Sequence, residues 1–390
     1  MTMNKVLLVV PLSTLKWGSK NEGGVDSVCQ MLVKRLQLRD KESYVYRVIA
    51  FDPSNTLRPS ECGKLIKLNN NVEVVRFRVN SQGLIFKLLP SILYHLWLIK
   101  KEAKCFQPDI IHVHQLSWSL LLGVETPIIT TLHSYKKICR KRLSKLNNFL
   151  YEVIVPYCAA FTVNRYTCVS NQFRNEIKGD INKPIDVIYN PISEKYFFST
   201  REQKAGNENI KLVTCALLTR RKGIHHVIEV VKELVNLGHC TTLTVIGPIS
   251  EKAYVKEIKE SINDYNLSDY ISFVGSKNSD EIISYYQRSD IGIFLSKEET
   301  FGLVPLEMLA SGLPVICTKT GVIGDIYKTT RNASIKVVDE NDYQSIIEHT
   351  LALTKDDYPC PRQVVEECFD SEFILGEYES VYAKEIASKC

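Results

Sequence analysis

Several common signatures are missing from this sequence. Its 12 cysteines are scattered without a C-x-x-C pair, which disfavours a zinc site and indicates reduced thiols in a cytoplasmic protein. No clean apolar run reaches the roughly 20 residues that a membrane-spanning helix needs. The apolar run at residues 6–10 ends at Pro11, which fits a buried first strand better than a signal-peptide core. There is no internal repeat and no low-complexity tract, so an ordinary globular protein is expected.

Charge is plentiful but unevenly distributed. Residues 1–200 contain 28 lysines and arginines against 15 acidic residues, or +13, and residues 201–390 contain 21 against 29, or −8, which together give the net +5. The basic half predicts an anionic partner, such as a membrane surface or a phosphate-bearing substrate. Nucleic acid is disfavoured, because no basic segment is interleaved with aromatic residues and no helix-turn-helix or RNA-recognition pattern is present.

Apolar runs rich in valine and isoleucine alternate with helix-length segments along the whole chain. This alternation is typical of α/β domains whose parallel sheets are covered on both faces. The polar stretch at 199–209 has no apolar period and divides the pattern in two. We therefore predict two Rossmann-like domains, 1–200 and 201–370, that face an interdomain cleft, with a helix at 371–390 that packs back toward the first domain.

The most informative stretch is residues 296–318, SKEETFGLVPLEMLASGLPVICT, which holds Glu299 and Glu307 eight positions apart. Pro305 suits the first turn of a helix, so the amides of residues 302–304 lie at a helix N-terminus, where a phosphate is favoured. Glu307 can accept hydrogen bonds from the vicinal hydroxyls of a sugar or ribose. The alternative is that Glu307 only interacts with the helix dipole.

Two further loops connect a strand to a helix and carry residues suited to phosphates. Arg220, Arg221 and Lys222 follow the strand that opens the second half, and three cations at such a turn predict a pyrophosphate clamp. The alternative there is a solvated basic turn. Gly23 and Gly24 precede a helix after the first strand, where glycines let the backbone approach a phosphate or sugar closely.

Together these segments resemble the retaining glycosyltransferases of family 4, which have the GT-B fold. EETFGLVPLEMLASGLPVICT is similar to the E-x7-E signature of that family, GGVDSVCQMLVKRL to its glycine loop and helix, and RRKGIHHVIE to its lysine loop. PDIIHVHQ and PIITTLHS resemble its two histidine-bearing strand ends, and VIYNPISEKYF resembles the segment that closes the first domain. The resemblance covers most of the chain, in the order of the family.

The resemblance implies a role for each matching residue. Glu307 would hold the ribose hydroxyls of a UDP- or GDP-sugar donor, and Glu299 would contact hydroxyls of the transferred sugar. Lys222 would neutralise the leaving diphosphate, and His133 would lie near the anomeric centre. The other donor-binding candidates are Gly23, Gly24, Arg220, Arg221, Phe301, Gly302 and Leu303.

The resemblance also implies chemistry without a cofactor. No D-x-D motif, which often holds a metal in the other common glycosyltransferase fold, occurs in the sequence, so metal-independent transfer with retained configuration is expected. Leu217 departs from the family, because an arginine usually stands there and pairs with the lysine on the diphosphate. Losing that contact costs roughly 1.5–3 kcal/mol unless Arg220 or Arg221 replaces it. His112 and His114 are interpreted as structural residues of the strand ends.

The acceptor is expected on the basic first domain. Residues 136–145 hold six basic residues in ten positions, with an apolar segment close behind. They predict an anionic membrane surface or a lipid-linked pyrophosphate acceptor, and the alternative is a solvated loop. The six residues are Lys136, Lys137, Arg140, Lys141, Arg142 and Lys145. Synthesis of cell-surface polysaccharide or lipopolysaccharide, in the cytoplasm or at the cytoplasmic face of the membrane, is the most specific expectation.

Three other functions stay open. A sugar-nucleotide epimerase of the GT-B fold would show the same periodicity, but the E-x7-E stretch with the lysine loop argues against it. A catalytically weak, donor-binding scaffold is favoured only by Leu217. A lipid-surface binding protein would need the basic residues of 136–145 but neither glutamate.

Overall fold

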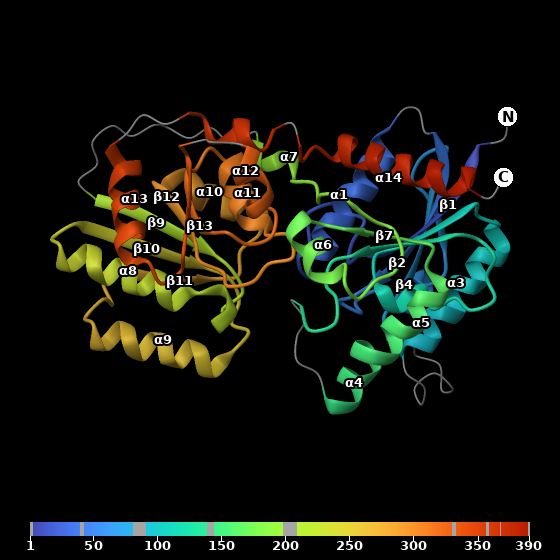
Figure 1. The fold of residues 1–390 in the computed structure, drawn as a ribbon, viewed down its shortest axis with the longest axis horizontal. Helices are drawn as coiled ribbons and strands as arrows, with labels where there is room; N and C mark the ends of the chain where they lie inside the picture. Colours follow the sequence, from blue (N-terminus) through green and yellow to red (C-terminus); the bar gives the residue numbers. More distant parts are fainter. Residues whose placement is uncertain are drawn as a thin grey trace. The chain divides into compact units, whose positions relative to one another are not determined.

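The computed structural model describes residues 3–39, 43–80, 91–138, 144–197, 209–329, 333–355, 359–366 and 368–388 (Figure 1). The chain divides into two compact units. Unit 1 comprises Met1–Pro191 with Ser371–Cys390, and unit 2 comprises Ile192–Asp370. The division falls after residue 191 instead of at the expected position 200. The polar stretch expected as a linker, 199–209, lies outside the described residues except for its last residue.

Unit 1 is built on an eight-stranded sheet in the order β3-β4-β2-β1-β5-β6-β7-β8. Every neighbouring pair is parallel except β3 and β4. The central strand β1 is apolar and buried throughout Val6–Val10, as expected for a sheet covered on both faces. The strands are β1 (Asn4–Pro11), β2 (Tyr44–Asp52), β3 (Leu65–Lys67), β4 (Val72–Arg78), β5 (Ile110–Val113), β6 (Ile128–Leu132), β7 (Arg165–Cys168) and β8 (Ile185–Val187).

The last helix of the chain, α14, is part of unit 1 (Figure 1). Arg39 forms ion pairs with Glu372 and Glu379 of this helix at 2.8 and 2.6 Å, and the Tyr46 hydroxyl donates to Glu379 at 2.8 Å. These contacts fix the C-terminal helix on a sheet formed by the N-terminal residues. The α-helices among the described residues of unit 1 are α1 (Gly24–Leu38), α3 (Ser91–Phe106), α4 (Lys145–Phe149), α5 (Val155–Thr162), α6 (Asn171–Ile177) and α14 (Ser371–Ala387), and the π-helical turn Leu150–Ile154 joins α4 to α5.

Unit 2 contains a six-stranded, entirely parallel sheet in the order β11-β10-β9-β12-β13-β14. Its strands are β9 (Asn209–Cys215), β10 (Cys240–Ile246), β11 (Ile271–Gly275), β12 (Ile291–Phe294), β13 (Val315–Thr318) and β14 (Ile335–Val338). Its helices are α7 (Glu194–Phe197), α8 (Ile224–Asn236), α9 (Lys252–Asp264), α10 (Ser279–Arg288), α11 (Leu303–Ala310), α12 (Ile323–Thr329) and α13 (Tyr343–Lys355). The strands and helices alternate as the sequence predicts.

The strand order of each unit indicates where a ligand binds. In unit 2 the order reverses at β9, whose neighbours are β10 and β12, and in unit 1 it reverses at β1, whose neighbours are β2 and β5. Ligands of open parallel sheets bind beyond the carboxyl ends of the strands at such a reversal. The loops that follow β9 and β12, and those that follow β1, β5 and β6, are therefore the places to look for a site.

Candidate active site

In unit 2, the loops that follow β9 and β12 bring Lys222 and Glu299 into contact. The Lys222 ammonium donates a hydrogen bond to Glu299 Oε1, and the Ser296 hydroxyl donates another to the same oxygen at 2.7 Å. Only 13% and 11% of the two charged side chains are exposed, and the Lys222 ammonium lies 5.4 Å from the centre of the Phe294 ring. The charges of the pair cancel, so a ligand that binds either side chain must compete with the other.

Gly223 allows these two loops to approach each other. Its φ of 68° is left-handed, and a Cβ there would come 2.0 Å from the carbonyl oxygen of Leu295. Only glycine fits such an approach. Two hydrogen bonds complete the contact: the Lys297 amide donates to the Arg221 carbonyl at 2.9 Å, and the Arg221 guanidinium donates to the Glu298 carbonyl at 3.2 Å.

The three cations of the loop after β9 have different partners. Arg221 and Lys222 contact the loop that follows β12. Arg220 instead forms an ion pair with Glu257 of α9, and its guanidinium lies 5.3 Å from the ring centre of Tyr254 on the same helix. The structure therefore places two of the three predicted phosphate-binding cations beside the E-x7-E segment and the third against α9.

Phe301, Gly302 and Leu303 lie at the start of α11. Gly302 is left-handed, with φ of 86°, and as the N-cap residue it has no side chain to bond the first amides of the helix. An anion can therefore accept hydrogen bonds from that turn. Phe301 is buried and packs against Phe369 with ring centres 6.0 Å apart, and its carbonyl accepts from the Val322 amide at 2.8 Å. These contacts fix the backbone that presents the amides.

Glu307 lies one turn further along α11 and is partly enclosed. Burial among Tyr196, Cys215 and Tyr286 raises its pKa to about 7, although a hydrogen bond with Tyr196 acts in the opposite direction. Burial and the nearby Glu307 raise the pKa of Cys215 to about 12. A carboxylate that only interacted with a helix dipole would keep a low pKa in water. Burial instead disfavours the ionised form of Glu307 when no ligand is bound. This is expected of a carboxylate that accepts hydrogen bonds from a ligand.

In unit 1, three histidines meet at the ends of β5 and β6. His114 Nδ1 lies 3.1 Å from His133 Nε2, and burial lowers the pKa of His133 to about 4. His112 is held by the hydroxyls of Thr131 and Tyr382, both at 2.7 Å, which agrees with its interpretation as a structural residue. His114 differs, because it contacts His133 and its buried Nε2 has no partner among the described residues. Across the described ranges, no group of three or more His, Cys, Asp or Glu could hold a metal ion.

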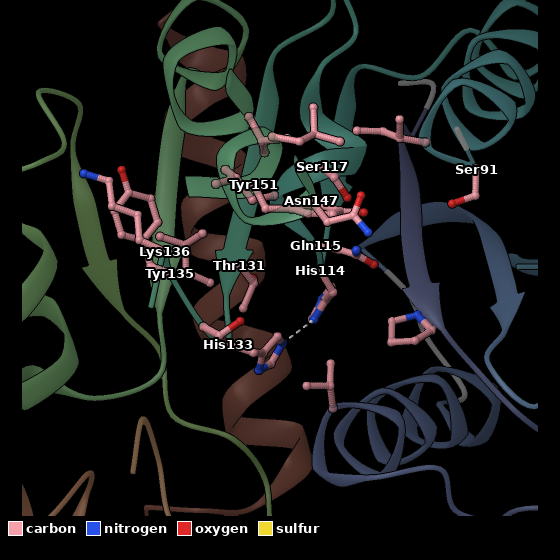
Figure 2. Close-up of a pocket in the computed structure, with 18 residues that line it drawn as sticks. Ser91, His114, Gln115, Ser117, Thr131, His133, Tyr135, Lys136, Asn147 and Tyr151 are labelled. Atoms are coloured by element: carbon pink, nitrogen blue, oxygen red, sulfur yellow. Dashed lines mark hydrogen bonds between the residues drawn. The ribbon is translucent and has the colours of Figure 1, made fainter. Parts of the chain in front are cut away.

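A cavity of about 680 Å³ in unit 1 has His114 and His133 in its wall (Figure 2). The two imidazoles are joined by the drawn hydrogen bond, while Tyr135 and Lys136 lie on one side of the cavity (Figure 2). No acidic side chain is among the described residues that line it. Its other labelled polar side chains are Ser91, Gln115, Ser117, Thr131, Asn147 and Tyr151. The cavity suits a neutral or anionic polar ligand.

The loop after β1 places Gly23 and Gly24 at the start of α1. Gly23 is the N-cap residue with φ of 118°, and Gly24 is the first residue of the helix. The buried Asp26 carboxylate shapes the loop, because it accepts from the Ser13 amide and from the Glu22 amide, both at 2.8 Å. The next residue of the helix, Val25, lines the histidine cavity. The glycines thus lie at the edge of that cavity.

The basic run is described only in part. Lys136 pairs with Asp180 at 2.7 Å, Lys137 is 85% exposed with Glu152 at 3.9 Å, and Lys145 is exposed. Arg140, Lys141 and Arg142, predicted for the same surface, lie outside the described residues. Among the helices that are described, none has the length and apolar content to cross a membrane.

Some contacts of the site were not predicted from the sequence. Ser296 shares the Glu299 oxygen with Lys222, and Tyr196 and Cys215 enclose Glu307. The position of Ser296 just after a strand was a usable signal, because parallel strands place such residues at the ligand-binding edge. No local pattern marks Tyr196 or Cys215, which lie about ninety or more positions before Glu307 in the sequence.

Comparison with known proteins gives matches along most of the chain. Residues 22–196 match the model described as Glycosyltransferase Family 4, and residues 197–367 match the model described as Glycosyl transferases group 1. The chain is 25% identical over 347 residues to the N-acetyl-alpha-D-glucosaminyl L-malate synthase of Bacillus anthracis, covering 82% of this chain and 86% of that protein. It is 29% identical over 205 residues to a capsular polysaccharide biosynthesis glycosyltransferase of Staphylococcus aureus, covering 50% and 49%.

Solved structures match over nearly the full length. The sucrose-phosphate synthase of Thermosynechococcus elongatus superposes with a TM-score of 0.73 at 17% identity, covering 99% of this chain and 100% of that one. A protein of Anabaena, solved in complex with UDP and glucose, superposes with a TM-score of 0.67 at 16% identity, covering 98% and 100%. At such identities the likeness shows the fold alone.

Proposed function

The chain belongs to the family 4 glycosyltransferases of the GT-B fold, and from this premise we propose that it transfers a sugar with retention of configuration, without a metal ion, from a UDP- or GDP-sugar. The proposed acceptor is a glycan or a lipid-linked pyrophosphate in cell-surface polysaccharide or lipopolysaccharide synthesis, at the cytoplasmic face of the membrane. The observation that carries the proposal is the contact between Lys222 and Glu299 beside the N-terminus of α11.

The donor's diphosphate is proposed to replace Glu299 as the partner of the Lys222 ammonium. A nucleoside diphosphate carries most of its charge on the phosphates, and that charge grows as the glycosidic bond breaks. The Lys222 ammonium and the first-turn amides after Gly302 are the groups in unit 2 that match this charge. When Lys222 turns to the diphosphate, the Glu299 carboxylate becomes available to accept hydrogen bonds from hydroxyls of the transferred sugar. Donor binding and assembly of the catalytic groups are therefore one step.

Glu307 is proposed to recognise the ribose. In the ligand-free site the ionised form of its carboxylate is only weakly favoured at neutral pH, because burial raises its pKa to about 7. Two ribose hydroxyls would supply the hydrogen bonds that an enclosed carboxylate needs. The Anabaena protein of the same fold was solved with UDP and glucose, and the donor proposed here is of that class.

His133 is proposed to orient the transferred sugar. Its pKa of about 4 keeps the imidazole neutral at physiological pH, so it can direct a hydrogen bond without repelling a developing positive charge on the sugar ring. No carboxylate suited to a covalent intermediate stands among the described residues that line the histidine cavity. The resemblance to family 4, and not this lining, is the reason for proposing that the acceptor attacks on the same face from which the diphosphate leaves.

Calorimetric titration with UDP, GDP and ADP, without added metal, tests the donor site. We expect one of the three to bind selectively and Glu307→Ala to weaken it by about tenfold or more, because two hydrogen bonds to a charged group are lost. Glu260→Ala, which removes an exposed glutamate of α9, is the matched control and should bind like the wild type. If no nucleotide binds, the donor-site proposal fails.

A donor-binding scaffold is the second candidate, and Leu217 is the observation that favours it. Leu217 follows β9 just before the loop of cations and is half exposed, where the family usually has an arginine. Product formation separates the two functions. Glu299→Ala should abolish sugar transfer by an enzyme, whereas a scaffold would form no product before or after the change.

A further inference from the structure

In unit 1, α4, the π-helical turn and α5 follow one another as a continuous helical segment (Figure 1), which we call the rod. The rod presents large apolar side chains to solvent. Five of them are between 49% and 77% exposed: Leu146, Phe149, Val153, Tyr157 and Phe161. They recur at intervals of three or four residues, the spacing of one helix face. Tyr157 and Phe161 confirm the shared face, because their ring centres are 5.3 Å apart. We call this surface the apolar face of the rod.

Charge is scarce on the rod, and among the described residues beside it lysines outnumber acidic side chains, of which Asp180 is one. Residues 144–162 contain one lysine, Lys145, and one acidic residue, Glu152. Lys137 lies next to the rod and is 85% exposed, and its ammonium is 3.9 Å from the Glu152 carboxylate. Lys178 shares a surface depression of about 760 Å³ with Val153 and Tyr157. An exposed helix with this composition fits an apolar layer bordered by negative charge.

The rod also separates two hollows of unit 1. Asn147 and Tyr151 line the histidine cavity, whereas Val153 and Tyr157 line the depression of about 760 Å³. Lys136 lines both. Lys136, which pairs with Asp180, is therefore a basic side chain shared by the depression beside the rod and the cavity that holds the two histidines.

We infer that the apolar face of the rod lies on an anionic lipid bilayer, with Lys137 and Lys145 at the level of the lipid headgroups. The inference rests on the proposed function for the identity of the acceptor and deepens it: a lipid-linked pyrophosphate acceptor is taken from the bilayer surface, and its pyrophosphate enters the histidine cavity beside Lys136. The lipid portion stays in the bilayer against the apolar face.

A second copy of the chain fits this face less well than a bilayer does. In a two-fold dimer the same patch lies on both subunits, so the lysines beside each rod would find few acidic partners on the other rod, whose one acidic residue is Glu152. An anionic bilayer offers apolar contact and opposite charge together. Each lysine near such a surface strengthens binding about fivefold, and each large apolar side chain that inserts contributes about as much or more.

Flotation with lipid vesicles tests the inference. The wild type is expected to float with vesicles of phosphatidylcholine mixed with phosphatidylglycerol and much less with pure phosphatidylcholine. The triple variant Phe149→Ser, Tyr157→Ser, Phe161→Ser should lose about a hundredfold in binding, and Lys137→Glu at least about fivefold. A matched triple control, Leu38→Ser, Leu237→Ser, Ile249→Ser, removes apolar side chains of similar exposure elsewhere and should float like the wild type.

Circular dichroism and nucleotide titration of each variant separate the possible failures. Loss of flotation in the rod variant, with an unchanged spectrum and unchanged nucleotide binding, supports the inference. A wild type that ignores anionic vesicles, or a rod variant that floats like the wild type, overturns it and leaves the donor-site proposal untouched. A wild-type dimer that the rod variant converts to a monomer also overturns it, because the face then belongs to a second copy. Flotation without nucleotide binding overturns the proposed function alone.

Discussion

Replacing Glu307 by glutamine should stabilise the protein at pH 8 while it weakens nucleotide binding. Burial raises the pKa of the Glu307 carboxyl from 4.5 to about 7. Between these two values the folded protein holds a proton that the unfolded chain releases, so the contribution of Glu307 to stability falls as the pH rises and is lowest above pH 7. The difference is about 3 kcal/mol at most, at about 1.4 kcal/mol for each unit of pKa. Glutamine has the same shape and carries no charge at any pH.

Urea unfolding of wild type and Glu307→Gln, followed by circular dichroism at pH 5 and pH 8, measures this difference. The two proteins should unfold at similar urea concentrations at pH 5, where Glu307 is protonated. At pH 8 the variant should be more stable by about 1–3 kcal/mol. Groups that titrate in both proteins cancel in the comparison. Trp17, Trp97 and Trp118 all lie in unit 1, so tryptophan fluorescence follows that unit separately.

The exposed residue Glu260 supplies the control for this experiment, because Glu260→Gln should change stability equally little at both pH values. A Glu307→Gln variant whose stability relative to wild type is the same at pH 5 and pH 8 would refute the reasoning, since the carboxyl would then not be held in an unfavourable charged state. The expected combination of higher stability and weaker nucleotide binding is typical of residues kept for function.

Three further predictions concern Lys222, Leu217 and Arg39. Lys222→Met should lower kcat for sugar transfer by about a hundredfold with little change in the circular dichroism spectrum, because the leaving diphosphate loses a cation. Leu217→Arg should raise nucleotide affinity by about tenfold in calorimetry if it restores a charge-assisted phosphate contact, and unchanged affinity would contradict that role. Arg39→Ala should destabilise unit 1 by about 3 kcal/mol in tryptophan-monitored unfolding, because Glu379 keeps a partly buried charge without its main partner.

The alternation of strands and helices was readable from the sequence because it depends on local periodicity. Continuous apolar runs such as β1 predicted strands covered on both faces, and Pro305 predicted the first turn of α11. The GT-B fold and membership in the glycosyltransferase family, expected from the resemblance, are confirmed by the comparisons. The roles of individual site residues stay predictions.

The exact division of the chain could not be read in the same way. The chain leaves unit 1 after Pro191, before the polar stretch that looked like a linker, and Ile192 already bonds to Phe369 within unit 2 at 3.0 Å. Low hydrophobicity marks exposed chain, but a domain boundary depends on which contacts a segment makes. Those contacts involve residues far away in the sequence.

The sequence by itself determined the spacing of the two predicted site residues Glu299 and Glu307, because both lie in one strand–loop–helix segment whose geometry is fixed locally. Only the tertiary structure decided their partners. Lys222 meets Glu299 across 77 positions because β9 and β12 are neighbours in the sheet, while the adjacent Arg220 bonds to α9. Side-chain partners depend on strand order and on the direction in which each residue leaves the backbone, and neither is encoded in a short stretch of sequence.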